Sequence, residues 1–358
     1  MKVAGPGGLL IVGTIVALLL AEALVRVGGV APEVGHVAKW RWRLSSNPKI
    51  GYELIPNAKP QGARPLGESS LSETSAYETS LAERPLPGHR GRANDLGFRD
   101  YDHRVEKAVG TQRAIVLGDS ITWGYRVPGD EDVFPSVVER KLIEAGRQAE
   151  VMNFGVGGYN TQQEVETLKD KGLVYDPDLV VLAYCLNDEK NADGGVYTQL
   201  LAAEQGAKHF NAARMNPVLR GSALVRFLYY RVFARDAAPE GADRSIFENH
   251  VERYFAELRQ IALREGFEVL VVVFPNFGGL DTERSYRFQE IHDRVRGYAA
   301  ANGFEHLDLL PSFLDCQRAN PDERLAFDSY HPTAAGHRCA GEAIANVLLE
   351  TFWGPGSH

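Results

Sequence analysis

The chain has 358 residues, which is enough for one full-sized hydrophobic core and leaves material for an anchor and for insertions. Its 39 basic and 47 acidic side chains give a formal net charge of −8, and no dense run of Lys and Arg occurs, so we expect no nucleic-acid partner. The three cysteines, Cys185, Cys316 and Cys339, are too few for a disulfide framework and lack the spacing of metal ligands, which argues against a disulfide scaffold and against a metal centre.

Residues 1–30 bear on the compartment in which the protein acts. No charged side chain occurs at residues 3–21, where Leu, Ile and Val dominate, and this stretch reaches the length of about 20 residues that a helix needs to cross a bilayer. Lys2 precedes it, which favours an amino terminus in the cytoplasm and an extracytoplasmic remainder. We therefore predict an amino-terminal transmembrane helix, a single-pass anchor that attaches the protein to a membrane.

Two alternatives to a retained anchor stay open for this segment. Ala21-Glu22-Ala23 fits the small-x-small pattern of a signal-peptidase site, so the segment could be removed and the protein secreted. A buried core helix is less favoured, because the segment lies at the extreme terminus before a break that contains Gly and Pro. Glu22 and Arg26 are four residues apart and could pair on one face of the helix.

Residues 31–110 form a lead-in region with little sustained periodicity. Within it, residues 60–92 contain few apolar side chains and many Pro, Gly, Ser and Glu residues. Such a composition cannot bury enough apolar surface to form a core, so we predict a flexible linker there.

Residues 111–354 alternate short apolar runs with helical patterns. The apolar runs are continuous, as in strands that are buried on both faces, and lie at 113–117, 150–153, 179–184 and 269–274. Helical periodicity occurs at 134–145, 162–171, 250–264 and 334–352. Thr161 is expected to cap the second helix, with Glu164 completing a capping box. This alternation predicts an α/β fold with a doubly wound parallel sheet.

An insertion at residues 189–247 interrupts the alternation after the third strand. It is long for a simple connection and contains a helical piece at 223–233. Insertions of this kind are often lids or specificity elements. We expect the helical piece to pack against the core in preference to resting on a membrane face.

A serine directly follows the first predicted strand, in the run Ile115-Val116-Leu117-Gly118-Asp119-Ser120. This is the edge at which open α/β sheets place their ligands. A serine attacks an ester at neutral pH only with an imidazole within hydrogen-bond reach and a carboxylate that orients the imidazole. Asp328 and His331 are three residues apart and can supply both from one loop, whereas His337 has no carboxylate at the matching offset. The sequence therefore predicts a serine hydrolase.

Four short blocks follow one another along the chain: Gly118-Asp119-Ser120, Asn153-Phe154-Gly155-Val156-Gly157-Gly158-Tyr159-Asn160, Cys185-Leu186-Asn187-Asp188 and Asp328-Ser329-Tyr330-His331. In this order they resemble the blocks of the SGNH or GDSL hydrolases, over roughly residues 111–350. The resemblance implies a flavodoxin-like SGNH hydrolase fold, of the membrane-anchored envelope type. It also implies a catalytic triad of Ser120, Asp328 and His331.

The same resemblance implies an oxyanion hole. Its donors would be the amides of Ser120 and Gly158 and the side chain of Asn187, with Gly155 and Gly157 as less favoured candidates. Asp119 is interpreted as a structural residue whose carboxylate accepts hydrogen bonds from loop amides.

The lead-in contains two pieces, 51–57 and 92–100, that are similar to segments preceding the hydrolase domain in envelope-anchored members of the family. We expect them to edge or cap the domain. Asn94 and Arg99 could instead reach substrate, although a surface or turn position is the preferred interpretation.

The cysteines depart from the family pattern at one position. Cys185 stands where the family usually has glycine, so its thiol could narrow the pocket or turn away from it. A bond between Cys316 and Cys339 is open in an oxidising compartment, but buried free thiols are common, and we expect this pair to be unbonded.

These observations predict a serine ester hydrolase, a GDSL-type acylhydrolase or acetylesterase that forms an acyl-enzyme and needs no metal or organic cofactor. Its substrate would be a carboxylic ester, either a small molecule or an O-acetylated glycan. Two alternatives stay open. The protein could be an O-acetyltransferase of extracytoplasmic polysaccharide, or an envelope protein that binds without catalysis.

Overall fold

The structure is a computed structural model that describes residues 6–27, 42–58, 93–189, 196–197, 200, 221–229, 248, 250–278, 280 and 286–354. The predicted linker at 60–92 and most of the insertion at 189–247 lie outside these residues. The chain forms two compact units. One comprises residues 1–39, 65–79 and 195–242, and the other comprises residues 40–64, 80–194 and 243–358.

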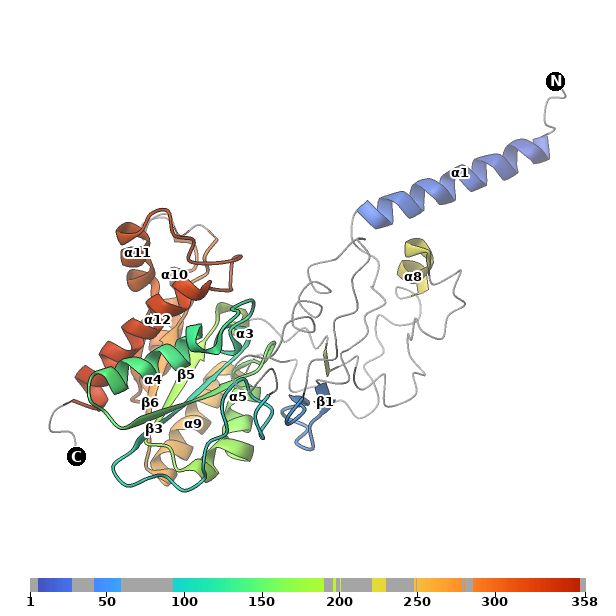
Figure 1. Cartoon of the computed structure of the whole chain (residues 1–358). Helices are drawn as coiled ribbons and strands as arrows, with labels where there is room; N and C mark the ends of the chain where they lie inside the picture. The colour runs from blue at the N-terminus through green and yellow to red at the C-terminus, as the bar shows by residue number, and fades with distance from the viewer. Residues whose placement is uncertain are drawn as a thin grey trace. The chain divides into compact units, whose positions relative to one another are not determined.

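The larger unit is built on a five-stranded parallel sheet (Figure 1). Its strands are β3 (Gln112–Gly118), β4 (Ala149–Gly155), β5 (Leu179–Tyr184), β6 (Glu268–Val273) and β7 (Glu305–Asp308). Their order across the sheet is β4-β3-β5-β6-β7, so the chain winds outward from β3 in both directions. The prediction of an α/β fold with a parallel sheet is confirmed. The carboxyl end of β3 lies at the point where the strand order reverses, the place where such sheets bind ligands.

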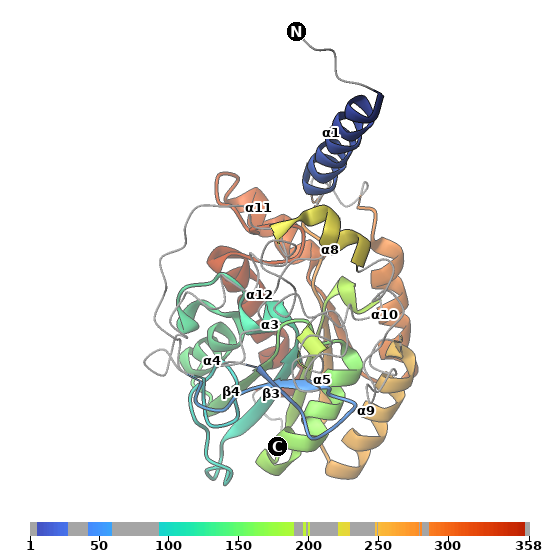
Figure 2. The same cartoon turned by 90° about the vertical axis from the view of Figure 1, so that its right-hand side faces the viewer.

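Helices cover both faces of this sheet, so the strands are buried on both sides. Figures 1 and 2 show α4 (Phe134–Glu144) beside α12 (Ala334–Val347) on one face. The other face carries α5 (Thr161–Thr167), α9 (Val251–Glu265) and α10 (Gln289–Ala301). A short helix, α11 (Leu310–Ala319), packs against α12. These layers bury the continuous apolar runs from which the strands were predicted.

The expected cap of α5 is wrong by one residue. Asn160, in extended conformation, caps the helix and accepts a hydrogen bond from the Gln163 amide at 3.1 Å, while the Gln163 side chain accepts one from the Asn160 amide. Thr161 instead donates its hydroxyl to Asp188 at 2.9 Å, and Glu164 is buried. Asn and Thr are both common N-cap residues, so the sequence offered two adjacent candidates, of which Asn is the stronger cap.

The lead-in adds an antiparallel hairpin to the same unit. Its strands are β1 (Trp42–Leu44) and β2 (Tyr52–Leu54), paired from Trp42 opposite Leu54 to Leu44 opposite Tyr52. All three side chains of β2 are buried. The hairpin therefore belongs to the body of the larger unit, along with residues 93–110.

The smaller unit contains α1 (Pro6–Val27) and α8 (Ala223–Tyr229). The predicted pairing of Glu22 with Arg26 occurs at 2.7 Å. Glu22 also accepts hydrogen bonds from the Ala223 and Leu224 amides at 2.8 and 2.7 Å, which caps the start of α8. Within the residues that the structure describes, no helix is long and apolar enough to cross a membrane.

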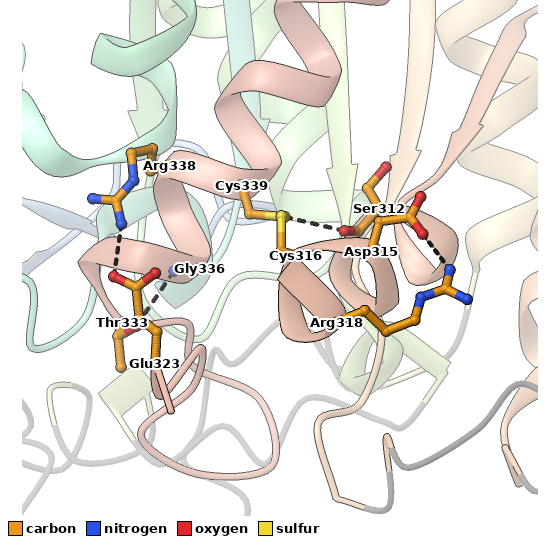
Figure 3. The surroundings of a disulfide bond; sticks show 9 residues. All are labelled: Ser312, Asp315, Cys316, Arg318, Glu323, Thr333, Gly336, Arg338 and Cys339. Carbon is orange, nitrogen blue, oxygen red and sulfur yellow. Dashed lines mark hydrogen bonds and ion pairs between the residues drawn. A yellow bond between two sulfur atoms is a disulfide. The ribbon is translucent and has the colours of Figure 1, made fainter. Parts of the chain in front are cut away.

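Cys316 and Cys339 form a disulfide, so the expectation of an unbonded pair is wrong (Figure 3). The bond joins α11 to α12, and the two Cα atoms are 6.4 Å apart, within the usual range for disulfides. The sequence could not reveal this approach, because it depends on how the two helices pack.

The disulfide predicts a redox-dependent stability. Replacing both cysteines, as Cys316→Ala with Cys339→Ala, frees a loop with a sequence separation of 23 residues. We expect the free energy of unfolding in urea to fall by roughly 3 kcal/mol. Dithiothreitol should lower the stability of the wild type by a similar amount and leave the double variant unchanged. Three titratable thiols in the denatured, unreduced wild type would contradict the bond.

Candidate active site

Ser120 lies at the sharp turn between β3 and α3 (Ser120–Trp123), as the first residue of α3. A side chain at Gly118 would lie 2.0 Å from the Thr122 hydroxyl, so only glycine allows the turn to close this tightly. Asp119 caps α3 by accepting a hydrogen bond from the Ile121 amide at 2.8 Å. The nucleophile candidate therefore begins a capped turn at the carboxyl edge of the sheet.

The structure brings the three predicted triad residues together. The Ser120 hydroxyl oxygen lies 3.0 Å from Nε2 of His331, and Nδ1 of His331 lies 2.9 Å from both carboxylate oxygens of Asp328. With the Nδ1 proton donated to Asp328, Nε2 can accept the serine proton. This is the arrangement needed to activate a serine hydroxyl.

Asp328 is held in its ionised form by its own loop. Partial burial alone would raise the pKa of this carboxyl group, but the hydrogen bonds from His331 and from the amides of Tyr330 and His331 outweigh it and hold the pKa well below its usual range. The carboxylate is therefore charged at neutral pH. It can orient the imidazole and stabilise the imidazolium that forms when the serine loses its proton.

Asn187 is tied to the residue that precedes the nucleophile. Its side-chain amide donates a hydrogen bond to Asp119 at 3.0 Å, and Asp119 is almost fully buried. Burial raises the pKa of Asp119, against the hydrogen bonds from the Ile121 amide and from Asn187 that lower it. One Asn187 amide proton is thus engaged, and the second is available to a ligand.

Gly158 lies on the loop that leaves β4, the strand that pairs with β3 from Gln112 to Gly118. Its φ of +82° is in the left-handed region, which favours glycine. Cys185 is 2% exposed and packs in the apolar core, where its thiol contacts the Asp119 carboxylate.

Two residues support the site in a role that the sequence did not reveal. The Tyr125 ring is buried, and its centroid lies 4.3 Å from that of the His331 ring.

Arg99 is 5% exposed, so a surface or turn position is wrong for it. Its guanidinium donates to the side chain of Asp130 and to the carbonyls of Trp123, Gly124, Val127 and Gly129. Arg99 thus clamps the loop that carries Tyr125. No sequence pattern distinguishes either residue.

Asn94 is also buried, but it acts within its own turn. Its side-chain oxygen accepts hydrogen bonds from the Leu96 and Phe98 amides at 3.1 and 2.8 Å. It therefore stabilises the lead-in, as a turn residue does.

A cavity of about 510 Å³ is lined in part by Asp328 and Ser329. Its lining combines aromatic rings with charged side chains, including Phe277, Phe327, Asp322, Glu323 and Arg324. Throughout the part of the chain that the structure describes, no cluster of three or more His, Cys, Asp or Glu residues is arranged to hold a metal ion.

Residues 116–339, well over half of the chain, match the family described as the GDSL-like Lipase/Acylhydrolase family. An arylesterase from Vibrio mimicus is 31% identical over 78 residues, which make up 22% of this chain and 38% of the arylesterase. The match thus spans less than half the length of that relative.

Solved structures of esterases resemble the chain more distantly. An acetyl xylan esterase is 20% identical with a TM-score of 0.42, and the match covers 66% of this chain and 99% of that one. An esterase active on acetylated mannans is 16% identical with a TM-score of 0.43, and the match covers 69% of this chain and 51% of that one. A lipase/acylhydrolase from Enterococcus faecalis is 18% identical with a TM-score of 0.40, and the match covers 66% of this chain and 95% of that one. Similarity this distant carries no information on substrate.

His337, the other histidine near the site, is fully buried and accepts a hydrogen bond from the Phe134 amide at 3.2 Å. Burial, together with the charges of Arg99 and His331, lowers its pKa to about 3. Between about pH 6.5, the ordinary histidine value, and pH 3, the unfolded chain binds a proton that the folded chain does not. Stability is therefore lost as the pH falls through this window.

We expect His337→Gln to make the free energy of unfolding less dependent on pH. Between pH 6 and pH 4 its slope should be shallower than that of the wild type by about 1.4 kcal/mol per pH unit. Urea unfolding at a series of pH values measures both slopes. A loss of packing that lowers the free energy of unfolding equally at every pH does not change the slope. Parallel slopes would show that His337 does not gain a proton on unfolding.

Proposed function

This chain belongs to the GDSL-like lipase/acylhydrolase family, and we propose that it is a serine esterase that hydrolyses carboxylic esters through an acyl-enzyme. The single observation that carries the proposal is the chain of contacts from the Ser120 hydroxyl through His331 to Asp328, at 3.0 and 2.9 Å. Residues separated by more than two hundred positions meet in the order that proton transfer requires.

In the first stage the Ser120 oxygen attacks the ester carbonyl while Nε2 of His331 takes the hydroxyl proton. The carbonyl oxygen becomes an oxyanion, for which the Ser120 and Gly158 amides and the Asn187 side chain are the proposed donors. His331 then gives its proton to the departing alkoxide. The alcohol leaves, and the acyl group stays on Ser120 as an ester.

In the second stage His331 removes a proton from water, which attacks the acyl-enzyme. The tetrahedral intermediate collapses, His331 returns the proton to the Ser120 oxygen, and the carboxylic acid is released. Asp328 remains ionised throughout and stabilises the imidazolium in both stages.

The triad predicts graded losses of activity on an aryl ester such as p-nitrophenyl acetate. Ser120→Ala and His331→Ala should abolish the acyl-enzyme route, and Asp328→Asn should lower kcat by about 10⁴, because the imidazole loses its orienting carboxylate. Asn187→Ala should cost about 10² to 10³ in kcat, the value of one oxyanion donor. Steady-state kinetics measures each loss.

A fluorophosphonate probe provides the control. It should label the wild type and Ser136→Ala, which changes a half-buried serine in α4, and should fail to label Ser120→Ala. Full activity in Ser120→Ala would refute the proposal, and absence of labelling in the wild type would favour a protein that binds without catalysis. Transfer of acetyl to an added glycan, at the expense of acetate release, would identify an O-acetyltransferase.

We propose an acetylated glycan as the substrate class. The cavity beside Asp328 offers ring faces such as Phe277 and Phe327 together with charged hydrogen-bonding groups such as Asp322. This mixed lining suits an alcohol that is rich in hydroxyl groups. Acetate release from acetylated xylan or mannan, compared with release from short-chain aryl esters, is the corresponding assay. Hydrolysis of aryl esters alone would leave a small ester as the substrate.

We further propose that the amino terminus anchors the enzyme to a membrane with the catalytic unit on the extracytoplasmic side. The uncharged apolar sequence at residues 3–21 supports this, as do the exposed leucines of α1, among them Leu18, Leu19 and Leu20. The Cys316–Cys339 disulfide also favours an oxidising compartment.

The anchor predicts that the full-length protein stays in the membrane fraction after washing with alkaline carbonate. Ile15→Arg should release a large part of it, because a charged side chain near the middle of a membrane helix costs about 3 kcal/mol, whereas Ile15→Ala should not. Complete release of the wild type would contradict anchoring. A mature amino terminus within Ala21-Glu22-Ala23 would instead indicate cleavage and secretion.

A further inference from the structure

A tyrosine from the lead-in hairpin contacts the loop that carries the Gly158 oxyanion donor. Tyr52, in β2, is 4% exposed, and its hydroxyl donates a hydrogen bond to the Gly157 carbonyl at 3.0 Å. In return, the hydroxyl of Tyr159 donates to the Tyr52 carbonyl at 2.5 Å. The hairpin and the loop therefore hold each other by two buried tyrosine hydroxyls.

The Gly157 carbonyl and the Gly158 N–H belong to one planar peptide unit. In a trans peptide these two groups point in opposite directions, and the structure contains no cis peptide among the residues it describes. A group that fixes the carbonyl therefore fixes the direction of the N–H. No described residue accepts a hydrogen bond from the Gly158 N–H, so the N–H is available to a ligand.

This peptide needs an external support because two glycines flank it. Gly157 and Gly158 lack the side chains that restrict backbone rotation, so the peptide between them can reorient at little cost. An oxyanion donor is effective only when it already points at the position where the charge develops. A side chain built on Gly158 would lie 2.9 Å from the Tyr52 hydroxyl oxygen, so the phenol lies directly against this glycine.

Tyr52 is itself held rigidly. Its ring makes edge contacts with the rings of Trp42 and Tyr159, at centroid distances of 5.4 and 5.3 Å. The backbone of the same hairpin is fastened to α5, because the Gln163 side chain donates a hydrogen bond to the Ile50 carbonyl at 2.7 Å. A hydrogen bond to a carbonyl also polarises the whole amide, which makes the N–H at its other end a stronger donor.

We propose that Tyr52 is a positioning residue of the oxyanion hole, which aims and polarises the Gly158 N–H through the Gly157 carbonyl. The inference rests on the proposed serine esterase function and deepens it. It assigns to the lead-in region a part in the reaction of the hydrolase domain, although Tyr52 touches neither the substrate nor the reacting atoms.

The test is Tyr52→Phe, which keeps the ring and its packing and removes only the hydroxyl. We expect kcat for an aryl ester to fall about 10-fold, less than the loss of a whole oxyanion donor, with KM changed less than twofold. The affinity for a boronic acid, which binds Ser120 as a tetrahedral anion, should fall in proportion to kcat/KM. Replacement of Tyr52 by 4-aminophenylalanine, which restores a donor, should recover most of the activity.

Tyr101→Phe is the matched control. It removes a phenol that also donates a hydrogen bond, to Glu139 at 3.0 Å, from a surface tyrosine outside the site. It should leave kcat and the boronic acid affinity unchanged. Rates are expressed per fluorophosphonate-labelled site, so loss of folded protein does not enter the comparison.

Two outcomes would overturn the inference. Tyr52→Phe could keep the wild-type kcat per labelled site. Alternatively, its affinity for the substrate and its affinity for the boronic acid could fall by the same factor. Failure of the proposed function is distinguishable from both, because it would appear as full activity in Ser120→Ala, whatever the behaviour of Tyr52→Phe.

Discussion

One buried carboxylate connects the parts of this site. Asp119 accepts a hydrogen bond from the Ile121 amide at the start of α3 and another from the side chain of Asn187 at the end of β5. Two neighbouring strands thereby converge on the residue before the nucleophile. Burial makes these bonds costly to lose, since an unpaired buried acceptor has no water to replace its partner. The nucleophile and one proposed oxyanion donor therefore share a single support.

Much of the fold could be predicted from local pattern. The four apolar runs became β3 to β6, and β5 has the predicted bounds, because strands buried on both faces have continuous apolar sequences. The edge strand β7 was missed, since its sequence Glu-His-Leu-Asp is polar and only partly buried. The disulfide was also missed, because it depends on the packing of α11 against α12. The local sequence pattern identifies individual helices and strands, whereas contacts between elements far apart in the sequence are seen only in the coordinates.

The same division holds for the site. Ser120, Asp328 and His331 were predicted as a triad from short blocks, and the structure brings them into hydrogen-bond contact. Their catalytic role stays a prediction. Tyr52 and Arg99 could not be predicted as supports, because each donates hydrogen bonds to backbone carbonyls far along the chain. Every residue has a backbone carbonyl, so the sequence does not indicate which of them accept such bonds. Only the coordinates reveal which carbonyls a tyrosine or an arginine reaches.

The lead-in therefore cannot be regarded as a passive spacer before a self-sufficient hydrolase domain. Arg99 satisfies four carbonyls and one carboxylate in the loop after α3, and a guanidinium with all its donors used is a rigid clamp. Tyr52 applies a similar restraint to the loop after β4. Loops around a site are usually its most mobile parts, whereas the stabilisation of developing charge requires fixed donors. Here two buried polar side chains from residues 42–110 supply that rigidity from outside the region that carries the family blocks.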